Sequence, residues 1–168
     1  MRVPEPAEGF LVRIDEVGDR LERLATTDPI PGGLTGPDEP SGERWDWGQV
    51  WAHLGEFVPY WMAQTKAIVE AGTDQPVPFG RVKTDRERVA AIERDRHLPP
   101  KDLMERLSSH LRDLRVMLAG LTPEDWQRRG MHETLGEMGV EGIVDMFLVK
   151  HLEDHADQLD DLVRGAAS

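Results

Sequence analysis

Apolar side chains recur at spacings of three and four residues along four separate stretches of this chain, and this feature constrains the fold more than any other. In the first stretch the recurring positions are Phe10, Ile14, Val17, Leu21 and Leu24. Such spacing places the apolar groups on one stripe of an α-helix, with the charged residues between them facing solvent. No stretch alternates apolar and polar residues with the period of two that predicts a strand.

Four amphipathic helices that must each bury one stripe predict an all-α protein, a four-helix bundle. We expect helices at residues 8–26, 46–70, 100–121 and 140–164, with a short charged helix at 84–94. Two segments rich in proline and glycine, 29–43 and 72–82, are the predicted long loops that cross over the bundle. The segment 129–139 is expected to be irregular.

Helix boundaries are marked by polar residues that can cap them. Asp46 with Gln49 and Thr84 with Glu87 have the three-residue spacing of a capping box, so we expect helices to begin there. Pro59 lies inside the second predicted helix, where it removes one backbone donor. We therefore expect a kink at Pro59 rather than a helix end.

Length, cysteine content and charge exclude several classes of protein. A chain of 168 residues is predicted to form one domain, residues 1–168. The absence of cysteine excludes disulfides, thiolate metal ligands and cysteine nucleophiles. A net charge of −12 disfavours binding to nucleic acid or to anionic lipid. Without an apolar run long enough to span a bilayer or to act as a secretion signal, the chain is expected to be a soluble cytoplasmic protein.

Three histidines lie on or beside the apolar stripes. His151 and His155 are four residues apart, so they project from the same side of the last helix, and His53 lies at the edge of the second stripe. Buried imidazoles need partners, and a divalent cation held by three of them would satisfy all at once. The alternative is that each histidine is a core-edge residue hydrogen-bonded to a carbonyl or carboxylate. The spacing by itself leaves both interpretations open.

Several segments together resemble the DinB/YfiT-like metalloprotein superfamily. The segment WGQVWAHL at 47–54, followed by Glu56, is similar to that family's segment around its first histidine. The segment HLEDHADQL at 151–159 is similar to its final His-x3-His-x2-Gln motif. Residues 121–126, LTPEDW, and the Gly-Glu turn at 136–137 resemble its connecting region. One departure is Gly139, where the family often has a capping Thr or Ser.

The resemblance implies a bundle with crossover connections, often a homodimer. It implies that His53, His151 and His155 hold a zinc or nickel ion in an open site. Family members include enzymes that use a low-molecular-weight thiol such as mycothiol or bacillithiol, among them a maleylpyruvate isomerase, and metal-dependent hydrolases. Such a site can activate water or a small-molecule thiol, which a protein without cysteine must take from solution. We therefore expect a thiol-dependent transferase or isomerase first and a hydrolase second, acting on a small-molecule substrate.

Other polar residues are candidates for supporting roles. Glu56, one turn after His53, is the predicted base or positioning partner, with a solvated helix carboxylate as the alternative. Gln158 is expected either to orient a ligand or to pair with a neighbouring helix, and His132 is the further histidine expected nearest the site. Asp154 gives an inverted zinc-protease spacing, but its helical angle points away from the stripe. The alternative to an enzyme is a non-enzymatic binding or interaction protein that keeps the metal, or only the histidines, as a structural element.

Overall fold

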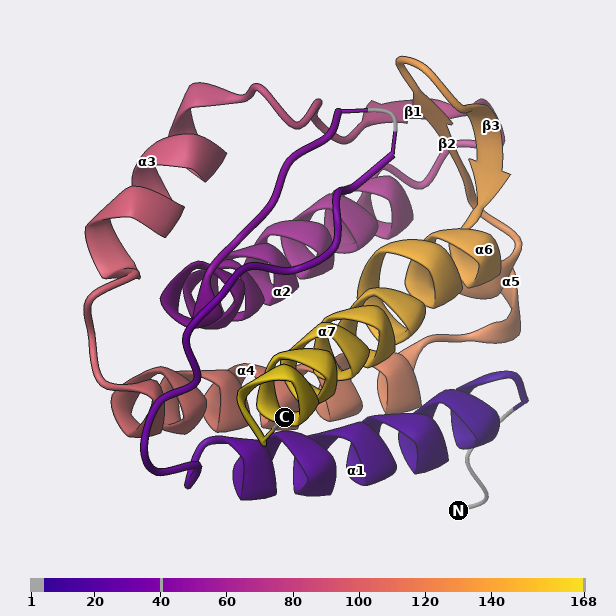
Figure 1. Ribbon diagram of the computed structural model, residues 1–168. Helices are drawn as coiled ribbons and strands as arrows, with labels where there is room; N and C mark the ends of the chain where they lie inside the picture. The colour runs from indigo at the N-terminus through magenta and orange to yellow at the C-terminus, as the bar shows by residue number, and fades with distance from the viewer. Residues whose placement is uncertain (1–4, 40, 168) are drawn as a thin grey trace.

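In a computed structural model the chain is a mostly helical bundle, and the four-helix prediction is confirmed (Figure 1). The structure describes residues 5–39 and 41–167, so residues 1–4, 40 and 168 of the predicted domain lie outside the described residues. Three of the long helices are α1 (Ala7–Leu24), α2 (Trp47–Glu70) and α4 (Pro100–Gly120). The last long helix is continuous through α6 (Val140–Ile143), a π-helical segment η1 (Val144–Val149) and α7 (Lys150–Ala167).

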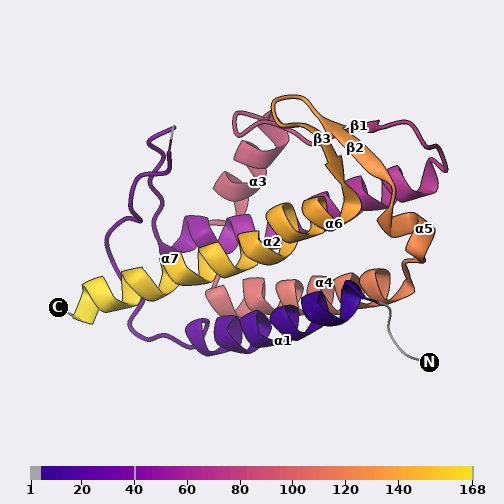
Figure 2. The ribbon, with the colours of Figure 1, turned by 90° about the vertical axis from the view of Figure 1, so that its right-hand side faces the viewer.

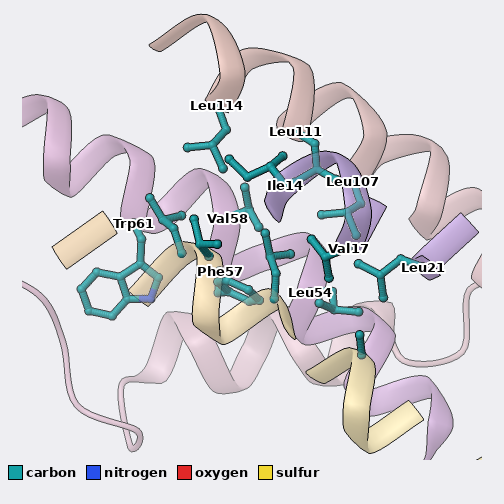
Figure 3. Close-up of a cluster of buried hydrophobic side chains, with 14 of the residues drawn as sticks. Ile14, Val17, Leu21, Leu54, Phe57, Val58, Trp61, Leu107, Leu111 and Leu114 are labelled. Carbon is teal, nitrogen blue, oxygen red and sulfur yellow. The ribbon is translucent and has the colours of Figure 1, made fainter. Parts of the chain in front are cut away.

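The bundle has two layers, with α1 beside α4 and α2 beside α7 (Figure 2). Their apolar stripes meet between the layers (Figure 3). The side chains labelled in that view are Ile14, Val17, Leu21, Leu54, Phe57, Val58, Trp61, Leu107, Leu111 and Leu114. Burial of each large apolar side chain contributes on the order of 2 kcal/mol, so the stripes predicted from spacing are what hold the layers together. No helix of the described residues is both long enough and apolar enough to cross a membrane.

Helix α2 begins where the capping-box spacing predicted. The Asp46 carboxylate accepts from the Gln49 backbone N–H at 2.9 Å, and the Gln49 side-chain oxygen accepts from the Asp46 N–H at 3.0 Å. The helix continues through Pro59 to Glu70, so the proline does not end it. The predicted cap at Thr84 is wrong, because Asp85 caps α3 (Arg86–Asp95) by accepting from the Arg88 N–H. Asp85, one residue after Thr84, is the residue whose carboxylate reaches a backbone N–H of the first helical turn that has no partner within the helix.

The prediction that the chain lacks strands is wrong, because three short strands form a small sheet: β1 (Val77–Phe79), β2 (Arg129–His132) and β3 (Gly136–Gly139). β1 pairs with β2 in parallel, and β2 pairs with β3 as an antiparallel hairpin. Strands of three or four residues are too short to show a period of two in sequence, which explains the error. Strand β2 has glycine at position 130 because a larger residue would not fit there: a Cβ at Gly130 would lie 2.4 Å from the Phe79 ring.

Both crossover connections pass over the outer face of the α2–α7 layer, together with the sheet (Figures 1 and 2). The first connection runs from α1 to α2. Its Thr35 N–H donates to the Trp45 carbonyl, and the Trp45 N–H donates to the Thr35 side-chain hydroxyl. The second runs from α2 to α4 and contains β1 and α3. The two connections contact each other through an Asp38–Lys83 ion pair. They therefore form a cover over one face of the bundle.

Candidate metal centre

Three histidines that the sequence predicts as ligands converge on this covered face. His53 comes from α2, and His151 and His155 come from successive turns of α7, which lies against α2. One nitrogen of each lies within 4.8 Å of the others. His53 and His155 are buried and His151 is half-buried. The i,i+4 spacing fixes the pair on α7, whereas the approach of His53 depends on helix packing.

Each imidazole is oriented by an acceptor at its Nδ1 atom. The Glu56 carboxylate lies 2.7 Å from His53 Nδ1, and the Phe147 carbonyl lies 3.2 Å from His151 Nδ1. The Gln158 side-chain oxygen lies 2.7 Å from His155 Nδ1. Because all three partners accept hydrogen bonds, each Nδ1 carries the proton and each Nε2 presents a lone pair. This arrangement is the one found behind metal-bound histidines.

One ring nitrogen of each histidine lies within 4.8 Å of the others, and with each Nδ1 engaged, Nε2 is the nitrogen left to bind a shared ion. His53 Nε2 and His151 Nε2 are 3.1 Å apart, and two lone pairs at that distance repel each other. Two histidine ligands of one tetrahedral zinc ion would stand about 3.3 Å apart, which is close to this separation. His155 Nε2 is buried, and no group of residues 5–39 or 41–167 hydrogen-bonds to it. The donor set therefore fits a divalent cation bound through three Nε2 atoms.

The electrostatic surroundings keep the imidazoles uncharged. Burial lowers the pKa of His53 and of His151 well below the ordinary value of 6.5. Burial also lowers the pKa of His155 to about 4, and the nearby Arg88 charge acts in the same direction. Neutral imidazole is the form that binds a metal ion, so no proton has to be displaced at neutral pH.

Glu56 lies behind His53 rather than beside the convergent Nε2 atoms. Its carboxylate is 8% exposed, with one oxygen on His53 Nδ1 and the other paired with Arg81. Burial raises the pKa of Glu56, while Arg81 opposes the rise. These contacts fit one of the two roles predicted for Glu56, that of positioning His53. The other role, that of catalytic base, stays a prediction.

The other sequence candidates fall into two groups. Gln158 and His132 are close to the centre, because Gln158 orients His155 and His132 is buried in the wall of the adjoining cavity. The Arg81 guanidinium, which contacts Glu56, also lies over the ring of Tyr60, with Cζ 3.9 Å from the ring centroid. Asp154 is exposed, which agrees with its predicted helical angle, and it pairs with Lys150 at 2.8 Å in the lining of the smaller of two cavities beside the histidines.

Two cavities meet at the histidines. The larger, of about 410 Å³, is lined by His53 and His151 together with Trp61, Phe147, His132 and Arg88 among others. The smaller, of about 160 Å³, lies towards the first connection and is lined by the three histidines, Thr35 and Trp45 among others. Trp45 forms part of this lining, with its ring stacked at 5.9 Å on His155 and edge-on at 4.8 Å to His53. The centre therefore borders both cavities, with His53 and His151 in the lining of each.

Sequence reasoning missed two features of the site. Arg88 is buried beside the histidines although it belongs to a short, highly charged helix, where spacing gave no sign of burial. The π-helical segment η1 ends two residues before His151, and such segments are rare and often found at functional sites. Its Phe147 supplies both the carbonyl on His151 and an aromatic wall of the larger cavity.

Solved structures with this fold were found at low sequence identity. YfiT from Bacillus subtilis, described as a probable metal-dependent hydrolase with an unusual four-helix bundle topology, is 18% identical. Its TM-score is 0.74, with 98% of this chain and 89% of that chain covered. An uncharacterised protein from Clostridium difficile is 14% identical, with a TM-score of 0.65 and coverages of 97% and 98%.

A mycothiol-dependent maleylpyruvate isomerase shares the same fold over part of its length. Its identity is 15% and its TM-score 0.66, and the match covers 92% of this chain but 60% of the isomerase. At these identities the structural matches show a common fold alone. A search of curated protein sequences found no match.

The family assignment comes from the sequence itself. A sequence model of the DinB superfamily matches residues 13–159, which include all three histidines, the whole of α2 and α4, and most of α1 and α7. The resemblance noted in the His53 and His151–Leu159 segments therefore extends over most of the chain. With this match and the bundle topology together, the chain belongs to the DinB superfamily.

Proposed function

We propose that this protein is a metal-dependent enzyme in which His53, His151 and His155 hold one zinc or nickel ion through Nε2. The observation that carries the proposal is the set of three convergent Nε2 lone pairs, each fixed by an acceptor on Nδ1. A non-enzymatic structural site would need no cavity beside it. Here the larger cavity opens directly on His53 and His151, which favours a site that binds a substrate.

A bound zinc or nickel ion would act as a Lewis acid and make water or a small-molecule thiol available as its anion at neutral pH. The chain itself holds the three imidazoles neutral, fixes their tautomers and packs the Trp45 ring against His155. It contains no cysteine, so any thiol must come from solution. We place a thiol-dependent transferase or isomerase first and a hydrolase second. The two functionally described structures, a probable hydrolase and a mycothiol-dependent isomerase, support these same two reaction types.

Metal analysis tests the proposal. Protein produced with zinc or nickel supplied should contain about one ion per chain, and His53→Ala and His155→Ala should lose it while keeping their helical circular dichroism. His110→Ala is the matched control, because His110 is a half-buried histidine on α4 outside the cluster. Wild-type protein without near-stoichiometric metal would refute the proposal. Metal retained in His53→Ala or His155→Ala would instead favour a non-enzymatic site that does not need the full cluster.

Activity assays then separate the two reaction types. Turnover of an electrophilic substrate that requires added mycothiol, bacillithiol or another small thiol would identify the transferase or isomerase. Turnover of an ester or amide without thiol would identify the hydrolase. The homodimer and the cytoplasmic location remain predictions, which size-exclusion chromatography and cell fractionation test.

A further inference from the structure

The larger cavity has flat aromatic walls. Trp61 and Phe147 stack with ring centroids 4.2 Å apart and planes 17° apart, and His132 stacks on Phe147 at 5.5 Å and 19°. Leu135 and Val82 complete the apolar part of the lining. A volume of about 410 Å³ is suited to a small organic molecule. This aromatic and apolar composition favours a ligand with an apolar body.

One polar group in this wall is His132, at the end of strand β2. Its Nδ1 accepts hydrogen bonds from the backbone N–H groups of Thr134 and Leu135, at 3.2 and 3.3 Å. Because Nδ1 accepts, the proton of the neutral ring is on Nε2. The chain passes closely over the ring at Gly80, where a Cβ would lie 2.6 Å from His132 Cδ2. His132 is therefore a fixed hydrogen-bond donor whose tautomer is set by the hairpin turn.

The second polar group is Arg88, whose guanidinium is 8% exposed. One nitrogen donates to the Lys83 carbonyl at 2.7 Å, and the paired carboxylate oxygen of Glu43 lies 3.5 Å away, at the limit of a hydrogen bond. Arg81, in the same wall, is by contrast in direct contact with Glu56. A buried guanidinium with such a distant counter-charge is costly, and an anionic ligand would offset that cost.

We propose that this cavity binds a small organic acid with an apolar body. Arg88 pairs with the carboxylate, and His132 donates a hydrogen bond from Nε2 to an oxygen of the same ligand. Because His53 and His151 form part of the same wall, the ligand lies beside the metal centre. This proposal rests on the proposed function, because it makes the acid the substrate of the metal centre. Binding of the acid, however, needs only Arg88, His132 and the aromatic walls.

Phenylacetate and its neutral analogue phenylacetamide test the charge selection. Zinc-loaded protein is titrated with each compound by calorimetry and tryptophan fluorescence, and wild type should bind phenylacetate at least tenfold more tightly. Arg88→Gln keeps a donor for the Lys83 carbonyl but removes the charge, so the preference should disappear. Arg88→Lys should keep most of it. Arg86→Gln, an exposed arginine two residues earlier on the same helix, is the control and should leave the preference unchanged.

His132→Asn tests the donor. The Asn oxygen can replace Nδ1 as acceptor for the hairpin N–H groups, but the Nε2 donor is lost. Both compounds should therefore bind several-fold more weakly while their ratio stays the same. His97→Asn, at an exposed histidine in a turn, should change neither affinity. Unchanged affinities in His132→Asn would refute the role of His132.

The wild-type protein by itself can refute the proposal. If it binds phenylacetate and phenylacetamide with equal affinity, the proposal is wrong, whether or not the variants fold. A preference that persists in folded Arg88→Gln, or that vanishes from wild type when zinc is removed, would show that the metal and not Arg88 selects the carboxylate. Metal content measured on the same samples keeps the two proposals apart. Stoichiometric zinc without a preference refutes only the cavity proposal, and a preference in protein that fails to bind zinc when zinc is supplied refutes only the proposed function.

Discussion

Replacing Glu56 with glutamine should weaken metal binding although it leaves the three histidines in place. The carboxylate lies 2.7 Å from His53 Nδ1 and contacts Arg81 through its other oxygen. Glutamine has the same shape but only one acceptor, so either His53 or Arg81 would face an N–H group. With the carboxylate 8% exposed, solvent cannot compensate.

The expected size of this effect follows from the position of Glu56 behind a metal ligand. Loss of such a partner costs about 10–100-fold in metal affinity, or about 1.4–2.7 kcal/mol. Titration of purified protein against a zinc chelator of known affinity measures it. Glu70→Gln is the matched control, because Glu70 is on the same helix, is largely exposed and pairs only loosely with Lys66 at 3.8 Å.

The result also separates two roles for Glu56. A positioning residue changes the metal dissociation constant, whereas a base that acts on substrate changes kcat and leaves the metal affinity alone. A zinc dissociation constant in Glu56→Gln within twofold of wild type, in a folded variant, would refute the reasoning. That outcome together with a large fall in kcat would make Glu56 the catalytic base predicted from its place one turn after His53.

Two further predictions concern stability. Metal-free protein should lose stability as pH falls from about 6.5 to 4. Histidines of the unfolded chain bind protons near their ordinary pKa of 6.5, whereas the buried histidines of the folded chain bind them only at lower pH. His155, with its pKa lowered to about 4, by itself contributes roughly 3 kcal/mol to this loss of folding free energy. Urea unfolding across this pH range measures the loss, and a stability unchanged or rising towards pH 4 would contradict it. Gly130→Ala should cost about 1–3 kcal/mol, since the new methyl group would lie 2.4 Å from the Phe79 ring. Thermal unfolding measures this cost. Gly9→Ala is the control, because Gly9 is at an open helical position where alanine should be neutral or stabilising. An unchanged unfolding midpoint for Gly130→Ala would show that the sheet can move to accommodate the methyl group.

The local features of this protein could be predicted from the sequence because neighbouring residues encode them. The spacing of Phe10 to Leu24 places one apolar stripe on α1, and the Asp46–Gln49 spacing marks the start of α2. His151 and His155 share a face of α7 because four residues make about one helical turn. None of these inferences requires knowledge of how one helix packs on another.

The sheet and the composition of the cavity depend on pairings between distant parts of the chain. Val77 pairs with Gly130, more than fifty residues away in the chain, and strands this short show no periodic pattern in the sequence. Arg88 belongs to a helix whose charges predict solvent exposure, yet the first crossover connection covers it and places Glu43 at 3.5 Å. A long-range contact can reverse what local composition suggests, because burial depends on what packs above a residue.

The sequence by itself determined four apolar stripes, and with them the bundle, and it placed His53 at the edge of one stripe and the His151–His155 pair on another. Only the tertiary structure decided that His53 Nε2 lies 3.1 Å from His151 Nε2, across 98 positions of the chain. The acceptors behind the imidazoles, and the positions of Arg88 and His132 in the cavity wall, were decided in the same way. Periodicity fixes which face of a helix is buried, but only packing fixes which buried faces meet.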